Sequence, residues 1–245
     1  MSEREVPLVG GDVNLVVRVG DTVRRPVGPV GVQALLRWYE DVGFDGAPRF
    51  IGIDEQGREV LSFVDGEPAF APVPAGDEVV AAIGRLLRRA HDAQAGFEPP
   101  IDADWQRHET DDDVGEVIGH CDLFWTNVIF RSGLPIALID WELARPTTRA
   151  LDVALAATYW GGVRIDGQLV QWGLPLERRG ERLRILCDAY GLDRSQRATM
   201  LDELAEHRRR RIEGGLWRGA TPREVIVSNA RWLENHRAEL ATFLA

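Results

Sequence analysis

The chain has 245 residues, of which 44% are hydrophobic and 28% are charged, and its formal net charge is -10 at pH 7. This length is enough to bury a sizeable core, in one domain or two small ones. The acidic balance argues against a nucleic-acid partner, which usually requires a basic face. No apolar run approaches the ~20 residues of a bilayer span, so no membrane association is expected.

The N-terminal stretch lacks the basic and then apolar pattern of a signal peptide. The only cysteines, Cys121 and Cys187, are too few for a disulfide framework. Both features predict a reducing, cytoplasmic location.

The first part of the chain is predicted to form strands and one helix. β-Branched residues predict strands over 13–21 and 22–27. Apolar residues at helical spacing predict a helix within 30–44. A hairpin is expected over 49–66, and the glycine and prolines at 66–74 mark a junction.

Beyond the junction the pattern becomes mainly helical. A strongly amphipathic helix is predicted over 77–94, with Asp77 as its N-cap. A shorter helix is expected over 113–118, a hairpin over 127–141, and helices from Ala150 onward.

This order predicts an α+β protein with two lobes. A small β-rich N-terminal lobe spans 1–66, and a larger, mainly helical C-terminal lobe spans 67–245. Clefts between two lobes are common ligand sites.

Polar residues that suit phosphate transfer gather around the central hairpin. The strands of a hairpin are antiparallel, so Asn127, at its start, and Asp140, at its end, are expected at one edge. Amide and carboxylate oxygens suit Mg²⁺ bound jointly with phosphate oxygens. Asp122 is placed to accept a hydroxyl proton. Each of the three alone is also typical of a turn or cap, but their order around one hairpin predicts a kinase-type site.

The segments HCDLFWTN (120–127) and LIDWE (138–142) resemble the aminoglycoside phosphotransferase and choline kinase-like family. In that family the loop typically reads H-G-D-x-x-x-x-N and the metal motif reads I-D-[FW]-E. The segment RALDVALA (149–156) resembles the helix that follows. The resemblance implies a protein-kinase-like fold, ATP or GTP with Mg²⁺, and transfer to a hydroxyl of an aminoglycoside, an amino alcohol or a sugar.

The resemblance also implies residue roles. Asp122 would be the catalytic base, and Asn127 and Asp140 the metal ligands. His120 and Asp152 would support the loop without taking part in the chemistry.

The chain departs from the family where the nucleotide phosphates bind. The family uses a strand lysine that pairs with a glutamate on the next helix, whereas the matching strand here offers Arg24 and Arg25. Alternation favours Arg25 as the inward side chain. Only Glu40 lies on the matching helix, at its far end, so the charge pair is expected to be missing. Arginine still forks onto phosphate, but it is not a neutral replacement for lysine.

Other expected nucleotide contacts carry weaker signals. Gly10, Gly11 and Asn14 would present backbone and amide groups to the phosphates, although adjacent glycines also mark ordinary turns. The adenine pocket is expected at the junction, with Val64 as a contact. Cys121 stands where the family has a small glycine.

Two hypotheses follow. The first is an active small-molecule kinase, favoured by the retained acidic and amide residues. The second is a catalytically silent kinase-like protein that binds nucleotide or a small ligand, favoured by the missing charge pair. The acidic charge suits a cationic acceptor, with 111–113, Glu142 and the acidic positions after 180 as candidate contacts, but many soluble enzymes are acidic for solubility alone, and that interpretation is favoured. The sequence leaves the acceptor, the choice of ATP or GTP and the oligomeric state open.

Two further patterns have alternative interpretations. The arginines at 208–211, beside Glu203 and Glu206, predict a salt-bridged helix surface. Tryptophans in the C-terminal half either stack on a ring or quaternary amine or pack in the core; they are Trp160, Trp172, Trp217 and Trp232.

Overall fold

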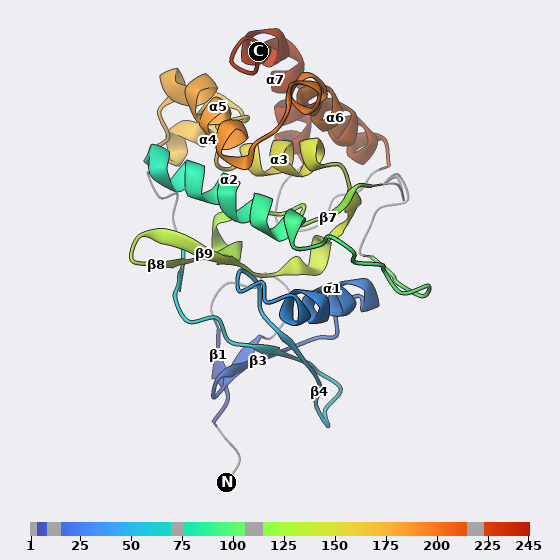
Figure 1. Cartoon of the computed structure of the whole chain (residues 1–245). Coiled ribbons are helices and arrows are strands. Elements are labelled where there is room, and N and C mark those ends of the chain that lie inside the picture. Colours follow the sequence, from blue (N-terminus) through green and yellow to red (C-terminus); the bar gives the residue numbers. More distant parts are fainter. Residues whose placement is uncertain (1–3, 9–15, 70–75, 106–114, 215–222) are drawn as a thin grey trace.

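The computed structural model describes residues 4–8, 16–69, 76–105, 115–214 and 223–245. One end of the molecule is a small antiparallel sheet and the other is a stack of helices (Figure 1). The sheet has the order β1-β2-β3-β5-β4. Its strands are β1 (Val6–Pro7), β2 (Val17–Val19), β3 (Thr22–Arg25), β4 (Phe50–Ile53) and β5 (Glu59–Ser62).

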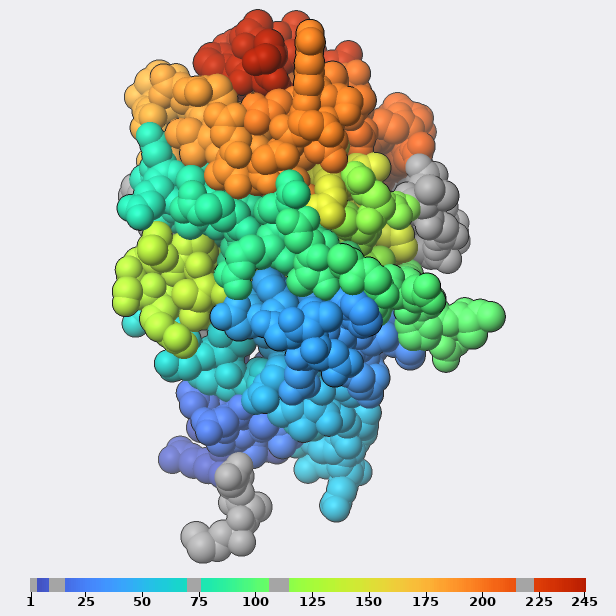
Figure 2. Space-filling view, viewed as in Figure 1, coloured from blue at the N-terminus to red at the C-terminus, as the bar shows by residue number. Residues whose placement is uncertain are grey.

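Helix α1 (Val30–Asp41) lies between this sheet and the helical lobe, and Figure 2 shows it (blue) seated against α2 (green). Its apolar face is buried, as the helical spacing predicts. Two side chains of α1 fasten it to the end of α2: the Tyr39 hydroxyl donates to the Ala90 carbonyl at 3.0 Å, and Trp38 Nε1 donates to the Ala93 carbonyl at 2.8 Å.

Helix α2 (Asp77–Asp92) begins after Gly76, and Asp77 is its first helical residue. The expectation that Asp77 is the N-cap is wrong, because its carboxylate bonds Arg178 at 3.0 Å instead of the helix backbone. The predicted apolar side is buried and packs against α5. Contact there is close, since a Cβ on Gly84 would stand 2.7 Å from the Leu186 carbonyl oxygen.

The C-terminal half is helical, as its periodicity predicts. Its helices are α3 (Arg149–Ala157), α4 (Asp166–Gln171), α5 (Arg179–Tyr190), α6 (Arg194–Glu213) and α7 (Arg223–Ala241), with 3-10 turns η1 (Trp125–Asn127), η2 (Trp141–Leu143) and η3 (Leu176–Arg178). None of the helices in the described ranges combines the length and the apolar character needed to cross a bilayer.

Two small sheets carry the middle of the chain. The predicted hairpin consists of β8 (Val128–Arg131) and β9 (Leu134–Leu138), and it turns at Ser132 and Gly133, which have positive φ. Strand β6 (Glu67–Pro68) pairs with β8. The chain therefore leaves the five-stranded sheet after Ser62 and joins the second sheet at Glu67.

The prediction of a helix over 113–118 is wrong at its C-terminal end. Residues 117–119 form the buried strand β7 (Val117–Gly119), which pairs antiparallel with β10 (Arg145–Thr147). A three-residue apolar run carries no periodicity of its own, so the pairing partner decides its conformation.

Candidate active site

A loop of five residues, 120–124, follows β7 and is held from beneath by Asp152 on α3. The Asp152 Oδ2 atom accepts from the His120 N–H at 3.0 Å, and its Oδ1 atom accepts from the Cys121 N–H at 2.8 Å. The Asp152 side chain is fully buried. A two-oxygen acceptor bonded to consecutive backbone amides fixes the path of the loop into Asp122.

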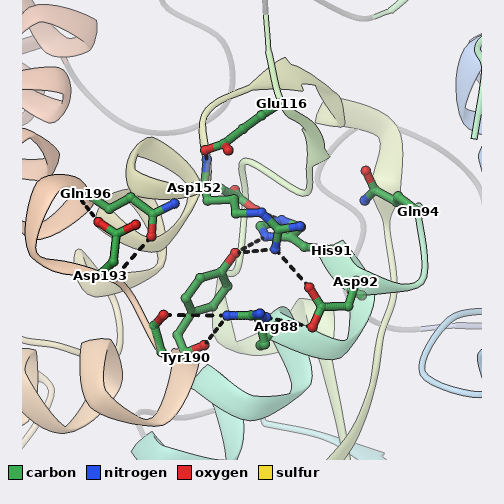
Figure 3. Close-up of polar contacts among 12 residues, drawn as sticks. Arg88, His91, Asp92, Gln94, Glu116, Asp152, Tyr190, Asp193 and Gln196 are labelled. Carbon is green, nitrogen blue, oxygen red and sulfur yellow. Dashed lines mark hydrogen bonds and ion pairs between the residues drawn. The ribbon is translucent and has the colours of Figure 1, made fainter. Parts of the chain in front are cut away.

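Asp152 is in turn held by a buried chain of side chains from α2, α3 and α5 (Figure 3). His91 lies 3.0 Å from Asp152 Oδ2 through Nε2 and 2.7 Å from the Tyr190 hydroxyl through Nδ1. Arg149 donates to the same hydroxyl at 3.1 Å. Because Arg149 only donates, the Tyr190 hydroxyl gives its proton to His91 Nδ1, and His91 Nε2–H points to Asp152.

This chain of bonds keeps Asp152 ionised. Burial would raise its pKa, but the hydrogen bonds from His91 and from the Cys121 N–H outweigh burial, and the net pKa is lowered. His91 was not predicted as a site residue. Its position on the apolar side of a helix is the one available signal, and that signal equally describes a core histidine.

Asp122 follows this held loop and is bonded to Asn127. The Asn127 Nδ2 atom donates to the Asp122 carbonyl at 2.9 Å and to its Oδ2 at 3.1 Å. Asn127 Oδ1 accepts a long hydrogen bond from Thr126 Oγ1 at 3.4 Å, and its second lone pair can face a cation. Burial raises the pKa of Asp122, and the negative charge of Asp140 adds to the effect, against the opposing effects of His120, Arg211 and Asn127.

The hairpin brings Asn127 and Asp140 to one edge. The Ile139 N–H donates to the Asn127 carbonyl at 2.9 Å, so Asp140 is one residue beyond the partner of Asn127. Asp140 and Cys121 both have left-handed backbones, with φ of 60° and 63°. Such residues cost about 1–3 kcal/mol and tend to occur at functional sites.

His120 ties the loop to the same hairpin. Its Nε2 donates to the Ile139 carbonyl at 2.9 Å, and its ring packs 4.7 Å, between centroids, from that of Trp141. The ring is fully buried. His120 thereby couples the segment before Asp122 to the segment before Asp140.

Arg25 reaches the same edge from the N-terminal sheet. Its Nε donates to Glu59 Oε2 at 2.5 Å, and its Nη1 donates to Asp140 Oδ1 at 3.1 Å. The strand-to-helix pair is not formed, since Glu40 on α1 contacts Arg49, and fully buried Glu59 supplies a carboxylate to Arg25 instead. The pair joins two neighbouring strands, with Arg25 directly opposite Glu59, instead of a strand and a helix. Arg24 points elsewhere, to Thr22 and Asp54.

Of the four other residues predicted to contact the nucleotide, one lies in a described range and three do not. Val64 is half-buried in the segment between β5 and β6. Within the described ranges its backbone N–H and C=O make no hydrogen bond, which leaves both for a ligand. Gly10, Gly11 and Asn14 lie outside the described residues, as do the acidic residues at 111–113.

The oxygen atoms near Asp122 fit a magnesium ion that is shared with a ligand. Among the described residues no three His, Cys, Asp or Glu side chains form a metal-binding group. Asn127 Oδ1 and the half-exposed Asp140 carboxylate are two hard oxygen donors. Two protein ligands suit Mg²⁺, which keeps waters and takes the rest of its shell from phosphate oxygens.

Comparison with known proteins agrees with this geometry. The model of the phosphotransferase enzyme family matches residues 102–186. A trifolitoxin immunity protein from Rhizobium leguminosarum bv. trifolii is 38% identical over 262 residues, covering 98% of this chain and 99% of the relative.

Solved structures with the same fold include a choline/ethanolamine kinase family protein from Mesorhizobium loti, with a TM-score of 0.65 and 14% identity over 98% of this chain and 92% of that one. An amicoumacin kinase in complex with AMP-PNP, Ca²⁺ and Ami has a TM-score of 0.63 and 13% identity, over 97% of this chain and 88% of that one. The GDP complex of an aminoglycoside 2'-phosphotransferase has a TM-score of 0.54 and 14% identity, over 98% and 94%. At these identities the likeness concerns the fold, and it confirms the predicted two-lobed kinase-like architecture.

Proposed function

The chain belongs to the phosphotransferase enzyme family, a family of small-molecule kinases, and we propose that it moves the terminal phosphate of ATP or GTP to a hydroxyl of a small molecule. The observation that carries this is the bond from Asn127 to Asp122, on the hairpin that also presents Asp140. That arrangement supplies a proton acceptor and two metal ligands at one place.

In this proposal Asp122 is the catalytic base. Its raised pKa brings its proton affinity closer to that of a working base at neutral pH. The acceptor oxygen forms a bond to the terminal phosphorus while the bond from that phosphorus to the bridging oxygen breaks. The hydroxyl proton passes to Asp122 and the nucleoside diphosphate leaves.

Asn127 and Asp140 would hold Mg²⁺, which neutralises charge on the phosphates when it is bound. Arg25 would turn from Asp140 toward the phosphates, with Glu59 keeping its guanidinium in place. Val64 would meet the adenine or guanine through its backbone, in an N-terminal lobe over 1–66. The glycines at 10 and 11 and Asn14 would complete the nucleotide site. A reducing cytoplasm would suit the two cysteines, neither of which forms a disulfide.

A second candidate function is protection by binding alone. The relative that aligns over almost the whole chain is an immunity protein, and immunity can be achieved by sequestering a toxic molecule as well as by phosphorylating it. In that case the kinase-like site would hold nucleotide or a small ligand without turnover.

Thermal unfolding of the full chain with ATP and with GTP, each with and without Mg²⁺, tests the nucleotide site. Binding to the native state raises the melting temperature by mass action. A Mg²⁺-dependent rise with one nucleotide supports the proposal and identifies the donor. No rise with either nucleotide contradicts it and favours the binding function.

A further inference from the structure

Four aromatic side chains stand beside the catalytic loop and form what we call the aromatic wall: Phe124, Trp125, Tyr159 and Trp172. Phe124 is two residues beyond Asp122, and its ring packs edge-on against Tyr159 with centroids 5.2 Å apart. Trp125 packs edge-on against Trp172 at 4.3 Å. Apart from Trp125, the members of the wall are only half-buried.

The wall is fastened to the loop that carries Asp122. The indole N–H of Trp160, the residue after Tyr159, donates to the Leu123 carbonyl at 2.8 Å. Burial raises the pKa of Tyr159, and the negative charge of Asp122 adds to that rise.

The cation position of this wall is already filled by the chain itself. The Arg164 guanidinium carbon lies 5.1 Å from the Tyr159 ring centroid and 4.7 Å from that of Trp172. An aromatic cluster of this kind would otherwise attract a ligand ammonium. With a guanidinium in place, a cationic acceptor meets charge repulsion as well as an occupied position.

A second arginine, Arg208, adds positive charge near Arg164. Arg208, on α6, is buried and donates to the Val163 carbonyl at 3.2 Å and to the Asn229 carbonyl at 3.0 Å. Burial and the charge of Arg164, with a smaller effect of Arg211, lower the pKa of Arg208 to about 9. Within the described ranges neither Arg164 nor Arg208 pairs with a carboxylate.

We propose that the acceptor is a hydroxy acid, whose carboxylate pairs with Arg164 while its ring or apolar part lies on the aromatic wall and its hydroxyl reaches Asp122. This rests on the proposed function, since it names the acceptor class of that site. Arg164 is half-buried and so remains accessible, whereas Arg208 adds to the positive potential from within. The proposal differs from the cationic acceptor that the acidic net charge favours, because local charge decides binding at short range.

A matched pair of aromatic alcohols tests the charge preference. 3-(Hydroxymethyl)benzoate and 3-(hydroxymethyl)benzylamine share a ring and a primary hydroxyl and differ in charge. The dissociation constant of each is taken from the concentration dependence of the melting temperature, with Mg²⁺ and a non-hydrolysable triphosphate analogue present. We expect the benzoate to bind at least about tenfold more tightly, as one charge-assisted hydrogen-bonded pair permits.

Variants assign the preference to Arg164. Arg164→Gln is expected to remove it, and Arg164→Lys to keep part of it, since lysine retains the charge but not the planar fork. Arg184→Gln is the matched control, because Arg184 is exposed on α5 and its ion pair is a loose 3.8 Å approach to Asp188. Equal binding of the two alcohols, including no binding of either, overturns the proposal, as does a preference that survives in Arg164→Gln.

The same samples separate the two proposals. A Mg²⁺-dependent nucleotide shift without a preference for the acid leaves the kinase function intact and removes only the acceptor class. A preference for the acid without any nucleotide shift leaves an anion-binding site and contradicts the kinase function.

Discussion

At the scale of single residues, the role proposed for Asp122 requires a carboxylate that lowers the stability of the fold. Asp122 is half-buried, and its partial burial and the negative charge of Asp140 raise its pKa. A carboxyl group whose folded pKa lies above its unfolded value destabilises the fold once the pH is high enough to ionise it. Such groups are expected where a protein keeps a proton acceptor for catalysis.

Asp122→Asn therefore has two expected effects of opposite sign. The turnover number falls about a hundredfold to ten-thousandfold, the usual contribution of a positioned base. The free energy of unfolding at pH 7 rises, because the unfavourable ionisation is gone. Steady-state kinetics and urea unfolding measure the two. Loss of turnover together with a lower melting temperature would mean that Asp122 serves the fold and not the chemistry.

At the scale of elements, the pairing of β3 with β5 supplies a contact that one strand cannot. Register places Arg25 opposite Glu59, so the guanidinium has a buried carboxylate on one side and Asp140 on the other. Glu59 is thus a positioning residue for Arg25. The pair replaces, between strands, the strand-to-helix pair that the family implies.

Glu59→Gln keeps the size of the side chain and removes its charge. We expect the free energy of unfolding to fall by about 2 kcal/mol, a typical value for a bond to a charged group. Nucleotide affinity should fall about tenfold, since Arg25 is then drawn to Asp140 alone. Titration calorimetry and urea unfolding report the two, with exposed Glu55→Gln as control. Unchanged nucleotide affinity would rule out a positioning role.

Three helices support the loop at 120–124 through hydrogen bonds among His91 on α2, Asp152 on α3 and Tyr190 on α5. His91→Leu leaves the Asp152 charge buried without that partner. We expect a loss of about 3 kcal/mol in the free energy of unfolding, as for other broken buried pairs. Arg88→Gln, at the exposed outer end of the cluster, should cost under ~1 kcal/mol. Equal losses in the two variants would contradict a stabilising role for the buried hydrogen bonds among Tyr190, His91 and Asp152.

At the scale of the whole molecule, acid should unfold the protein partly through Asp152. Its folded pKa is lowered, so its stabilisation is complete above the unfolded value of about 3.9 and is lost as the pH falls through the lower, folded value. Carboxylates at the surface contribute little, such as half-exposed Glu206, whose pKa is lowered to about 2 by its hydrogen bonds with Arg209 and Arg210. The urea midpoint of the wild type should fall below about pH 4, and Asp152→Asn should flatten that fall. Parallel curves would exclude Asp152 as a source of the acid sensitivity.

Much of the architecture follows from short-range pattern. Apolar spacing predicts the buried faces of α1 and α2, and Ser132 and Gly133 predict the turn between β8 and β9. These succeed because helical period and turn chemistry depend on neighbours within a few residues. The family assignment rests on equally local motifs at 120–127 and 138–142, and the comparisons confirm it.

The predictions that the structure contradicts concern residues whose partners are distant in the chain. Residues 117–119 form a strand because β10 lies beside them. The prediction of a salt-bridged surface at 208–211 is correct for Arg209 and Arg210, which pair with Glu206, and wrong for Arg208, which is buried. Helical spacing alone does not say which side of α6 meets α3.

By itself, then, the sequence determined the two-lobed α+β organisation and the family, because both depend on local periodicity and on motifs contiguous along the chain. Tertiary structure alone decided that Glu59 holds Arg25, that His91 holds Asp152, and that Arg164 occupies the aromatic wall. The first two contacts join side chains from separate elements, and the third joins the segments on either side of α4. The energy of an ion pair or a ring contact depends on a distance that only packing sets.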